Sequence, residues 1–338
     1  MEHMNGTKKT LAALTLLICS LSLFSASTPD KPAIADRDRI RLAEAFRIAE
    51  RPGEDLWKNW NAAPFAVLLV TSEYEFLIRH DRPSPDFEPL GRDELFDSDV
   101  WFRKRTMNQD LLATFPAVGG VPTIVIGQAE NTAAQTSTPW VLTLLHEHFH
   151  QLQMSHPDYY ASVDSLDLSG GDQSGMWMLN FPFPYDSKVV QEKLSNSSRL
   201  LLDALQEKKT PGKYFVAREQ WKSSMKDEDY RYLSFQLWQE GIARYTEYRM
   251  AVLASEKHVP SKSFAALSDY ETFNQSADKI LRRIKKELAD FNLMKDGRVS
   301  FYTLGAAEGL LLDKMVPNWR DDYFVHKFFL EKYAHKVE

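Results

Sequence analysis

The sequence predicts an α+β protein in which a small, mainly antiparallel sheet is followed by a predominantly helical region. Two observations predict this. Short runs of the strand type are confined to the first third of the 338 residues, and apolar residues at helical spacing dominate the remainder. With 43% hydrophobic residues, a chain of this length can bury one large core or two smaller ones.

The first third is expected to contain one helix and four strands. Apolar side chains at helical spacing over residues 36–50, followed by Pro52-Gly53, predict the helix. The strand candidates are short apolar or alternating runs, most of them next to turn residues, at 65–70, 73–78, 100–105 and 121–126. The first two are separated only by Thr71-Ser72, so we expect them to be neighbouring antiparallel strands.

The remainder of the chain is expected to be mostly helical. Thr138-Pro139 suits an N-cap followed by proline at the first helical position, which predicts a buried helix over 139–153. A Ser- and Gly-rich loop at 165–175 falls within a long insertion expected around residues 155–230. Further helices are predicted at 188–206, 227–256, 277–291, 301–315 and 321–333.

The first 27 residues have the features of a signal peptide. Lys8 and Lys9 precede a largely apolar run at 11–24, and Ser25-Ala26-Ser27 supplies small residues for cleavage. The apolar run is short for a bilayer span. We therefore expect export to a bacterial periplasm or the cell exterior, with an uncleaved membrane anchor as the alternative. Residues 28–338 are then expected to form one domain.

Composition excludes several classes of function. The chain is mildly acidic, with a formal net charge of −6, and it has one cysteine, Cys19, inside the predicted signal peptide. A chain without a basic patch is not expected to bind nucleic acid, and it has no disulfide framework. No later segment is long and apolar enough for a stable membrane span. Nothing in the sequence indicates the oligomeric state.

His146, Glu147 and His150 form an HExxH motif within the predicted helix 139–153. Residues four apart on a helix lie on one face, so the two histidines can offer their nitrogens to one metal ion. Glu147 would lie beside that metal and can exchange a proton with water and with a leaving group. Catalytic zinc sites typically use three protein ligands. Glu240 is the candidate third ligand, and Glu247 is either a ligand or a residue that orients a metal-bound histidine.

These motifs resemble those of the gluzincin metallopeptidases, especially their aminopeptidase branch. Residues 240–247 match every defined position of that branch's EGxAxYxE pattern. The resemblance implies a zincin-like catalytic region with a Zn²⁺ cofactor, in which Glu240 is the third ligand and Glu247 is structural. The spacing departs from the family, because the long segment 151–239 separates the HExxH motif from Glu240.

Two further segments resemble parts of the same branch. Residues 301–306 are similar to its YxxGA segment, which implies that Tyr302 donates a hydrogen bond to the oxyanion. Simple packing at the start of a helix is the alternative for Tyr302. Residues 127–131 resemble the GxMEN segment that holds a substrate's amino terminus, with Ala129 in place of Met. A polar loop after a strand explains that segment equally well, so an exopeptidase and an endopeptidase both stay open.

The sequence thus predicts an exported zinc metallopeptidase that hydrolyses a peptide or protein substrate. His146, His150 and Glu240 are the expected metal ligands, Glu147 the general base and Tyr302 the oxyanion donor. Two alternatives stay open: a zinc-dependent hydrolase of a non-peptide amide, and a non-catalytic, zincin-derived binding protein. Retention of Glu147 argues against the second alternative, because a site kept only for binding does not need a general base.

Overall fold

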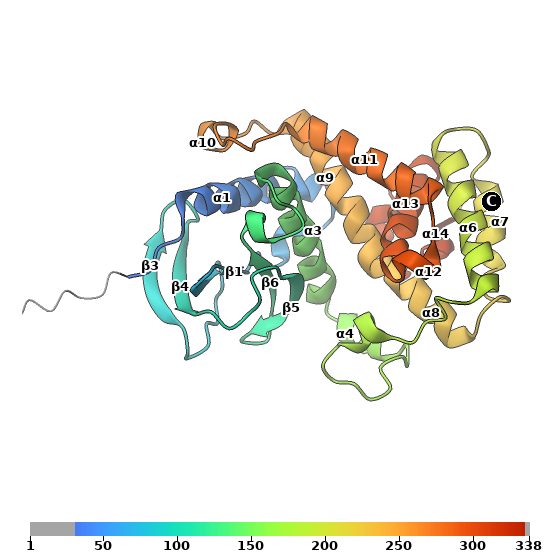
Figure 1. The fold of residues 1–338 in the computed structure, drawn as a ribbon, viewed down its shortest axis with the longest axis horizontal. Coiled ribbons are helices and arrows are strands. Elements are labelled where there is room, and N and C mark those ends of the chain that lie inside the picture. The colour runs from blue at the N-terminus through green and yellow to red at the C-terminus, as the bar shows by residue number, and fades with distance from the viewer. Residues whose placement is uncertain (1–30, 335–338) are drawn as a thin grey trace, which may run out of the picture. The chain divides into compact units, whose positions relative to one another are not determined.

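The structure is a computed structural model that describes residues 31–334, so the predicted signal peptide, residues 1–27, lies outside the described residues. From Pro32 onward the chain forms one compact unit. In the described residues this unit combines a six-stranded mixed sheet with many helices, which confirms the predicted α+β class. Figure 1 shows the sheet at one end of this unit and most of the helices at the other.

The sheet contains two strands more than the sequence predicts. Its order is β3-β4-β2-β1-β6-β5, and only the β1–β6 pair is parallel. The predicted antiparallel pairing of the first two strands is confirmed. The strand bounds are β1 Val67–Val70, β2 Tyr74–Ile78, β3 Glu88–Asp93, β4 Ser98–Lys104, β5 Leu112–Val118 and β6 Val121–Gly127.

The two unpredicted strands lie at the two edges of the sheet. This position explains why their sequences lack the pattern of a buried strand. Strand β3 is largely exposed and has no apolar alternation. Strand β5 contains Pro116, a residue that argues against a central strand but is tolerated at an edge. The prediction of four strands was therefore wrong, because edge strands do not need the buried pattern on which it was based.

Both faces of the central strand β1 are buried. Val67 and Leu69 belong to the main hydrophobic core, whereas Leu68 and Val70 belong to a smaller cluster on the other face. This alternation follows from the two-residue period of a strand. The main-core face is covered by helices, and one of them, α3 (Ser137–Ser155), contacts both β5 and β6.

The helices mostly lie where the sequence predicts them. The longer ones are α1 Asp36–Glu50, α3 Ser137–Ser155, α6 Lys188–Leu205, α7 Gly212–Glu219, α8 Asp227–Gln236, α9 Ile242–Lys257, α11 Phe273–Ala289 and α13 Val299–Met315. The short ones are α2 Gly53–Leu56, α4 Tyr159–Asp164, α5 Trp177–Asn180, α10 Lys262–Ala265, α12 Leu293–Asp296 and α14 Glu331–Ala334. None of the helices in the described part of the chain has the length and apolarity needed to cross a bilayer.

Three helix predictions need correction. The expected helix 321–333 is instead a 3₁₀ turn at Trp319–Asp322, an irregular stretch and the short α14. The long helix expected over 227–256 is interrupted by a π-helical turn, Leu237–Gly241, labelled η3. Helix α3 begins two residues early, with Thr136 at the N-cap position. The hydroxyl of Thr138 donates instead to the carbonyl oxygen of Glu271.

Helix α3 joins the two parts of the fold. It contacts α1 and the strands on one side and α9 on the other, so it lies between the sheet and the helical part (Figure 1). Helices α9, α11 and α13 contact one another, and α6 contacts α11 and α13. Much of the segment expected as an insertion is thus packed into the helical core.

Candidate metal centre

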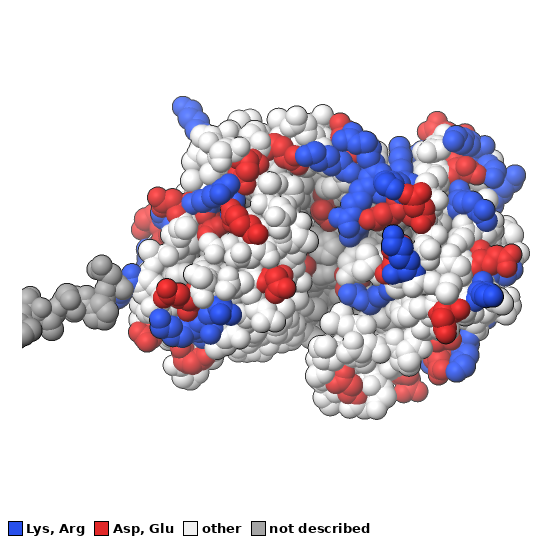
Figure 2. All heavy atoms as spheres, viewed as in Figure 1, with Lys and Arg blue, Asp and Glu red and all other residues white. Residues whose placement is uncertain are grey.

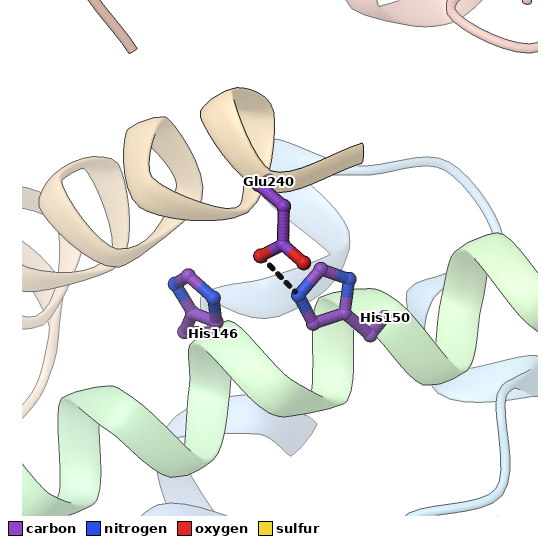
Figure 3. Close-up of side chains that lie close together, drawn as sticks. All are labelled: His146, His150 and Glu240. Atoms are coloured by element: carbon purple, nitrogen blue, oxygen red, sulfur yellow. Dashed lines mark ion pairs between the residues drawn. The ribbon is translucent and has the colours of Figure 1, made fainter. Parts of the chain in front are cut away.

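The two histidines of the HExxH motif and Glu240 converge on one point. Figure 3 shows His146 and His150 pointing from α3 toward Glu240, which reaches them from the facing helix. One ligand atom from each of the three residues lies within 4.8 Å of the others. Both histidines are buried. Two imidazole nitrogens and a carboxylate oxygen are a donor set that zinc binds in proteins, so the residues present fit a zinc ion.

Each histidine has a polar partner behind its ring. Nδ1 of His146 lies 3.6 Å from Oε2 of Glu247, and Nδ1 of His150 lies 2.8 Å from Oε1 of Gln153. With Nδ1 occupied in each ring, Nε2 is left for a metal ion. Nε2 of His150 indeed lies 3.4 Å from Oε2 of Glu240. The structure therefore places Glu247 beside Nδ1 of His146 and outside the group formed by His146, His150 and Glu240.

Gln153 also joins the two elements that carry the candidate metal ligands. Its side-chain nitrogen donates to the carbonyl oxygens of Trp238 (3.3 Å) and Gln239 (3.2 Å) in the π-helical turn. It donates as well to the hydroxyl of Tyr323, at 2.9 Å. One buried amide thus holds His150 and at the same time fixes the turn that carries Glu240.

Two glycines explain how Glu240 and Tyr302 reach the same place. Gly241 follows Glu240 in the π-helical turn, and Gly305 lies in α13, the helix of Tyr302. A Cβ on Gly305 would lie 2.5 Å from the carbonyl oxygen of Leu237, and one on Gly241 would lie 2.4 Å from Cα of Gly305. Only glycine permits this close contact. The glycines of the EGxA and YxxGA segments therefore bring the two helices together.

The charges of the cluster favour a cation between its carboxylates. Burial alone raises the pKa of Glu240, but the attraction of His150, its hydrogen bond and Arg298 outweigh burial and lower that pKa to about 2. Burial lowers the pKa of His150, and Glu240 reverses this and raises it to about 9. The pKa of Glu247 is lowered as well, because a hydrogen bond from His146 and the charge of Arg244 overcome burial. Both carboxylates are therefore anionic at neutral pH.

Glu147 lies on α3 next to the sheet edge. Its Oε2 accepts a hydrogen bond of 2.8 Å from Oγ1 of Thr114, a residue of the edge strand β5. The same hydroxyl lies 3.0 Å from the backbone carbonyl oxygen of Glu147. Sequence reasoning missed Thr114 because it missed β5. The pattern of an apolar run broken by Pro116 was the one signal for such an edge strand.

Tyr302 lies beside the candidate metal ligands. Its ring stacks on that of His146 with 6.5 Å between centroids, and its hydroxyl accepts a hydrogen bond of 3.0 Å from Nη1 of Arg298. Burial, reinforced by the charge of Glu240, raises the pKa of Tyr302 well above its ordinary value. The hydroxyl therefore keeps its proton. Arg298 was not singled out from the sequence, although it precedes Tyr302 by four residues, a spacing that places two side chains together on a helix.

The GxMEN-like segment does not join the cluster. The carboxylate of Glu130 pairs with Arg37 at 2.9 Å and with Arg41 at 2.7 Å. Arg41 also donates to the hydroxyl of Ser137, at the start of α3. That end of the helix is about 2.5 turns before His146. Glu130 is committed to arginines there, so it offers no anchor for an amino terminus at the metal ligands.

A hollow opens on one face of the molecule. Figure 2 shows it between the part that contains the sheet and the helical part. By its place in Figure 1, it lies between β5 and α3 on one side and α12 and α13 on the other. Thr114 belongs to β5, Glu147 to α3 and Tyr302 to α13.

Comparison with protein-family models, with curated proteins and with solved structures found no match for this chain. The interpretation of the site therefore depends on its geometry and on the motifs in the sequence. This interpretation is based on the candidate ligand atoms, on their polar partners and on the neighbouring carboxylate of Glu147.

Proposed function

We propose that the protein is a zinc-dependent peptidase whose active site is formed by His146, Glu147, His150 and Glu240. One observation carries the proposal: three metal-binding side chains from two separate elements meet in a buried cluster, and Glu147 lies on the same helix next to His146. Three protein ligands leave a coordination position for water, which is typical of catalytic rather than structural zinc. The resemblance of both motifs to gluzincins points to the same chemistry.

The chain's own residues supply the acid–base steps. Zinc bound by the three ligands would lower the pKa of a water molecule and polarise the scissile carbonyl. Glu147, held by Thr114, takes a proton from the water while the water oxygen bonds to the carbonyl carbon. Glu147 then delivers that proton to the amide nitrogen as the carbon–nitrogen bond breaks. The products are a carboxylic acid and an amine.

Tyr302 is placed to stabilise the charge that develops on the carbonyl oxygen. Arg298 donates to the oxygen of the Tyr302 hydroxyl, and the hydroxyl proton interacts with the carboxylate of Glu240. With that carboxylate bound to zinc, the proton would be free to donate to the substrate. A donor held in position before the reaction stabilises the transition state without reorganisation. Arg298 thus acts as a positioning residue for Tyr302.

The free edge of the sheet favours a peptide over a small amide. In the described residues β5 pairs only with β6, so its outer edge is left with unpaired backbone groups. An extended peptide can pair with such an edge. Thr114 links this strand directly to Glu147. A peptide lying along β5 would therefore pass close to the general base.

Replacement of Glu147 tests the proposal. The Glu147→Gln variant is expected to bind zinc like the wild type but to lose hydrolysis of a broad peptide library by at least about a thousandfold, because it lacks the general base. Metal analysis and mass spectrometry of the digest measure the two properties. Glu94→Gln, at an exposed position, is the control and should behave as wild type. Full activity of Glu147→Gln would contradict the mechanism, and a zinc-loaded wild type without turnover would favour a non-catalytic site.

A further inference from the structure

Arg298 has donors that the protein does not use. Its side chain is 22% exposed. Nη1 donates to Tyr302 at 3.0 Å and lies 3.3 Å from Oε1 of Gln236 and 3.4 Å from Oε1 of Glu240. Across residues 31–334, neither Nε nor Nη2 of Arg298 has a hydrogen-bond partner. The edge of the guanidinium formed by these two nitrogens is therefore available to a ligand beside the metal cluster.

The second arginine of the site is used differently. Arg244 is 8% exposed. It pairs with Glu247 at 3.8 Å and with Glu287 at 3.5 Å. Both guanidinium carbons lie over the ring of Tyr302, at 5.4 Å for Arg244 and 5.3 Å for Arg298. Arg244 is buried between two carboxylates, so Arg298 is the cation that a substrate can reach.

The net charge of the site is positive when a divalent ion is bound. Arg298 pairs with Glu240, Arg244 pairs with Glu247 and Glu287, and Glu287 also pairs with Arg283. Together with Glu147, these residues are four carboxylates and three guanidinium groups. A divalent cation bound to neutral imidazoles therefore leaves one excess positive charge. Figure 2 shows Lys and Arg side chains interspersed with Asp and Glu on the helical side of the hollow. A substrate that brings one negative charge would balance the loaded site.

We infer that Arg298 binds a carboxylate of the substrate and that the substrates are therefore peptides with a carboxylate near the scissile bond. The inference rests on the proposed function, because it names the substrate class of that site. Nε and Nη2 form the side of a guanidinium that binds the two oxygens of a carboxylate with two parallel hydrogen bonds. The carboxylate comes either from the C-terminus of the peptide or from an Asp or Glu side chain.

A binding experiment without turnover tests the inference. Full-length, zinc-loaded Glu147→Gln protein is immobilised and exposed to a peptide library made in four forms, with a free or amidated C-terminus and with or without Asp and Glu. Mass spectrometry quantifies the retained peptides. Peptides with a carboxylate are expected to be retained at least about tenfold better than the neutral form. The comparison between the free-C-terminus form without Asp and Glu and the amidated form with them identifies the source of the carboxylate.

Two substitutions of Arg298, made in the Glu147→Gln protein, test whether Arg298 causes the preference for peptides with a carboxylate. Arg298→Gln removes the charge and should abolish the preference, whereas Arg298→Lys keeps the charge without the paired donors and should retain part of it. Arg79→Gln is the control, because Arg79 has a similar side-chain exposure of 24% and is also hydrogen-bonded. Zinc content and thermal unfolding are measured for each variant to show that the fold is intact.

The outcomes separate this inference from the proposed function. Equal retention of charged and neutral forms, including no retention of either, would overturn the carboxylate site. A preference that survives in Arg298→Gln would overturn the role of Arg298. A wild-type protein that cleaves neutral and acidic peptides equally well would leave the peptidase intact and remove the inference. If the protein retains acidic peptides through Arg298 but its wild type hydrolyses none of them, the carboxylate site would stand and the proposed peptidase function would fail.

Discussion

Each histidine of the proposed metal site has a polar partner behind it, and the two partners differ in charge. His146 faces the carboxylate of Glu247 at 3.6 Å, and His150 faces the neutral amide of Gln153 at 2.8 Å. A carboxylate partner fixes the tautomer of an imidazole and increases its basicity, and so strengthens its bond to a metal. Glu247 is therefore expected to contribute to metal affinity without binding the metal itself.

Replacement of Glu247 by Gln is expected to weaken zinc binding by about 10–100-fold. Replacement of Glu240 by Gln should weaken it further, because it removes a ligand. Competition with a chelator of known affinity measures both variants. Glu256→Gln lies on the same helix at an exposed position and should bind zinc like the wild type. Equal affinity of Glu247→Gln and wild type would show that Glu247 has no such role.

The residues of the site differ in how far the sequence predicts them. His146 and His150 follow from a local motif, HExxH, whose four-residue spacing places both histidines on one face of a helix. Glu240 and Tyr302 required motifs, because only tertiary packing brings their helices to α3. Thr114 carries no local signal, since its role depends on a strand pairing formed elsewhere in the chain.

At the scale of elements, the contact between the π-helical turn η3 and α13 determines where Glu240 lies. Gly241 and Gly305 meet there without side chains between them. A π-helical turn inserts one residue into a helix and often marks a functional position. Here it carries Glu240 itself. The position of the proposed third ligand, Glu240, thus depends on a close contact between two backbones.

Gly305→Ala is expected to disrupt this contact. The added Cβ would lie 2.5 Å from the oxygen of Leu237. Such overpacking typically lowers the free energy of unfolding by about 1–3 kcal/mol, and the displaced turn should also bind zinc more weakly. Urea unfolding and zinc competition measure the two effects. Gly212→Ala, where an added Cβ has no atom within 4 Å, is the control. Unchanged stability and zinc affinity of Gly305→Ala would refute the proposed contact.

The incorrect helix prediction at 321–333 has a local explanation. Tyr323, Phe328, Leu330 and Tyr333 are all buried, so the apolar spacing on which the prediction was based does reflect burial. The backbone of Phe328 is nevertheless left-handed, with φ of 69°, a conformation that ends a right-handed helix. Periodicity indicates which residues are buried but does not exclude an irregular chain.

At the scale of the whole molecule, one arginine deep in the helical core faces two carboxylates. Nη2 of Arg218 lies 3.1 Å from Glu331, and its Nε lies 3.8 Å from Glu308. Arg218 and Glu308 are fully buried, and Glu331 almost so. One positive charge cannot fully compensate two negative ones. Burial therefore raises the pKa of Glu308 to about 7, although Arg218 opposes the shift.

This cluster predicts a dependence of stability on pH. The pKa of Glu308 rises from an ordinary value of 4.5 to about 7 on folding, so the folded state binds the proton more tightly. The resulting stabilisation is complete below pH 4.5 and is lost as the pH rises through 7, with a total change of ~3 kcal/mol. Urea unfolding between pH 5 and 8 measures it.

Glu308→Gln is the matched variant for this prediction, since it keeps the shape of the protonated carboxyl and does not titrate. The difference in unfolding free energy between wild type and Glu308→Gln should therefore change with pH in the stated direction. Groups far from Arg218 titrate equally in both proteins and cancel. A difference that is constant from pH 5 to 8 would contradict the assigned pKa.

The site joins the two parts of the fold. The sheet side provides Thr114, α3 provides both histidines and Glu147, and the helical part provides Glu240. A metal ion that binds all three ligands must therefore stabilise their association, since it binds the folded state alone. Metal content is thus the property that depends most directly on the central claim.

The decisive measurement is the zinc content of the purified full-length protein, compared with that of Glu240→Gln, after both are exposed to the same limited zinc concentration and desalted. The account predicts about one zinc ion per wild-type chain and little or none in the variant. A wild type without zinc would contradict the claim that His146, His150 and Glu240 form a metal site, as would zinc binding that does not depend on Glu240.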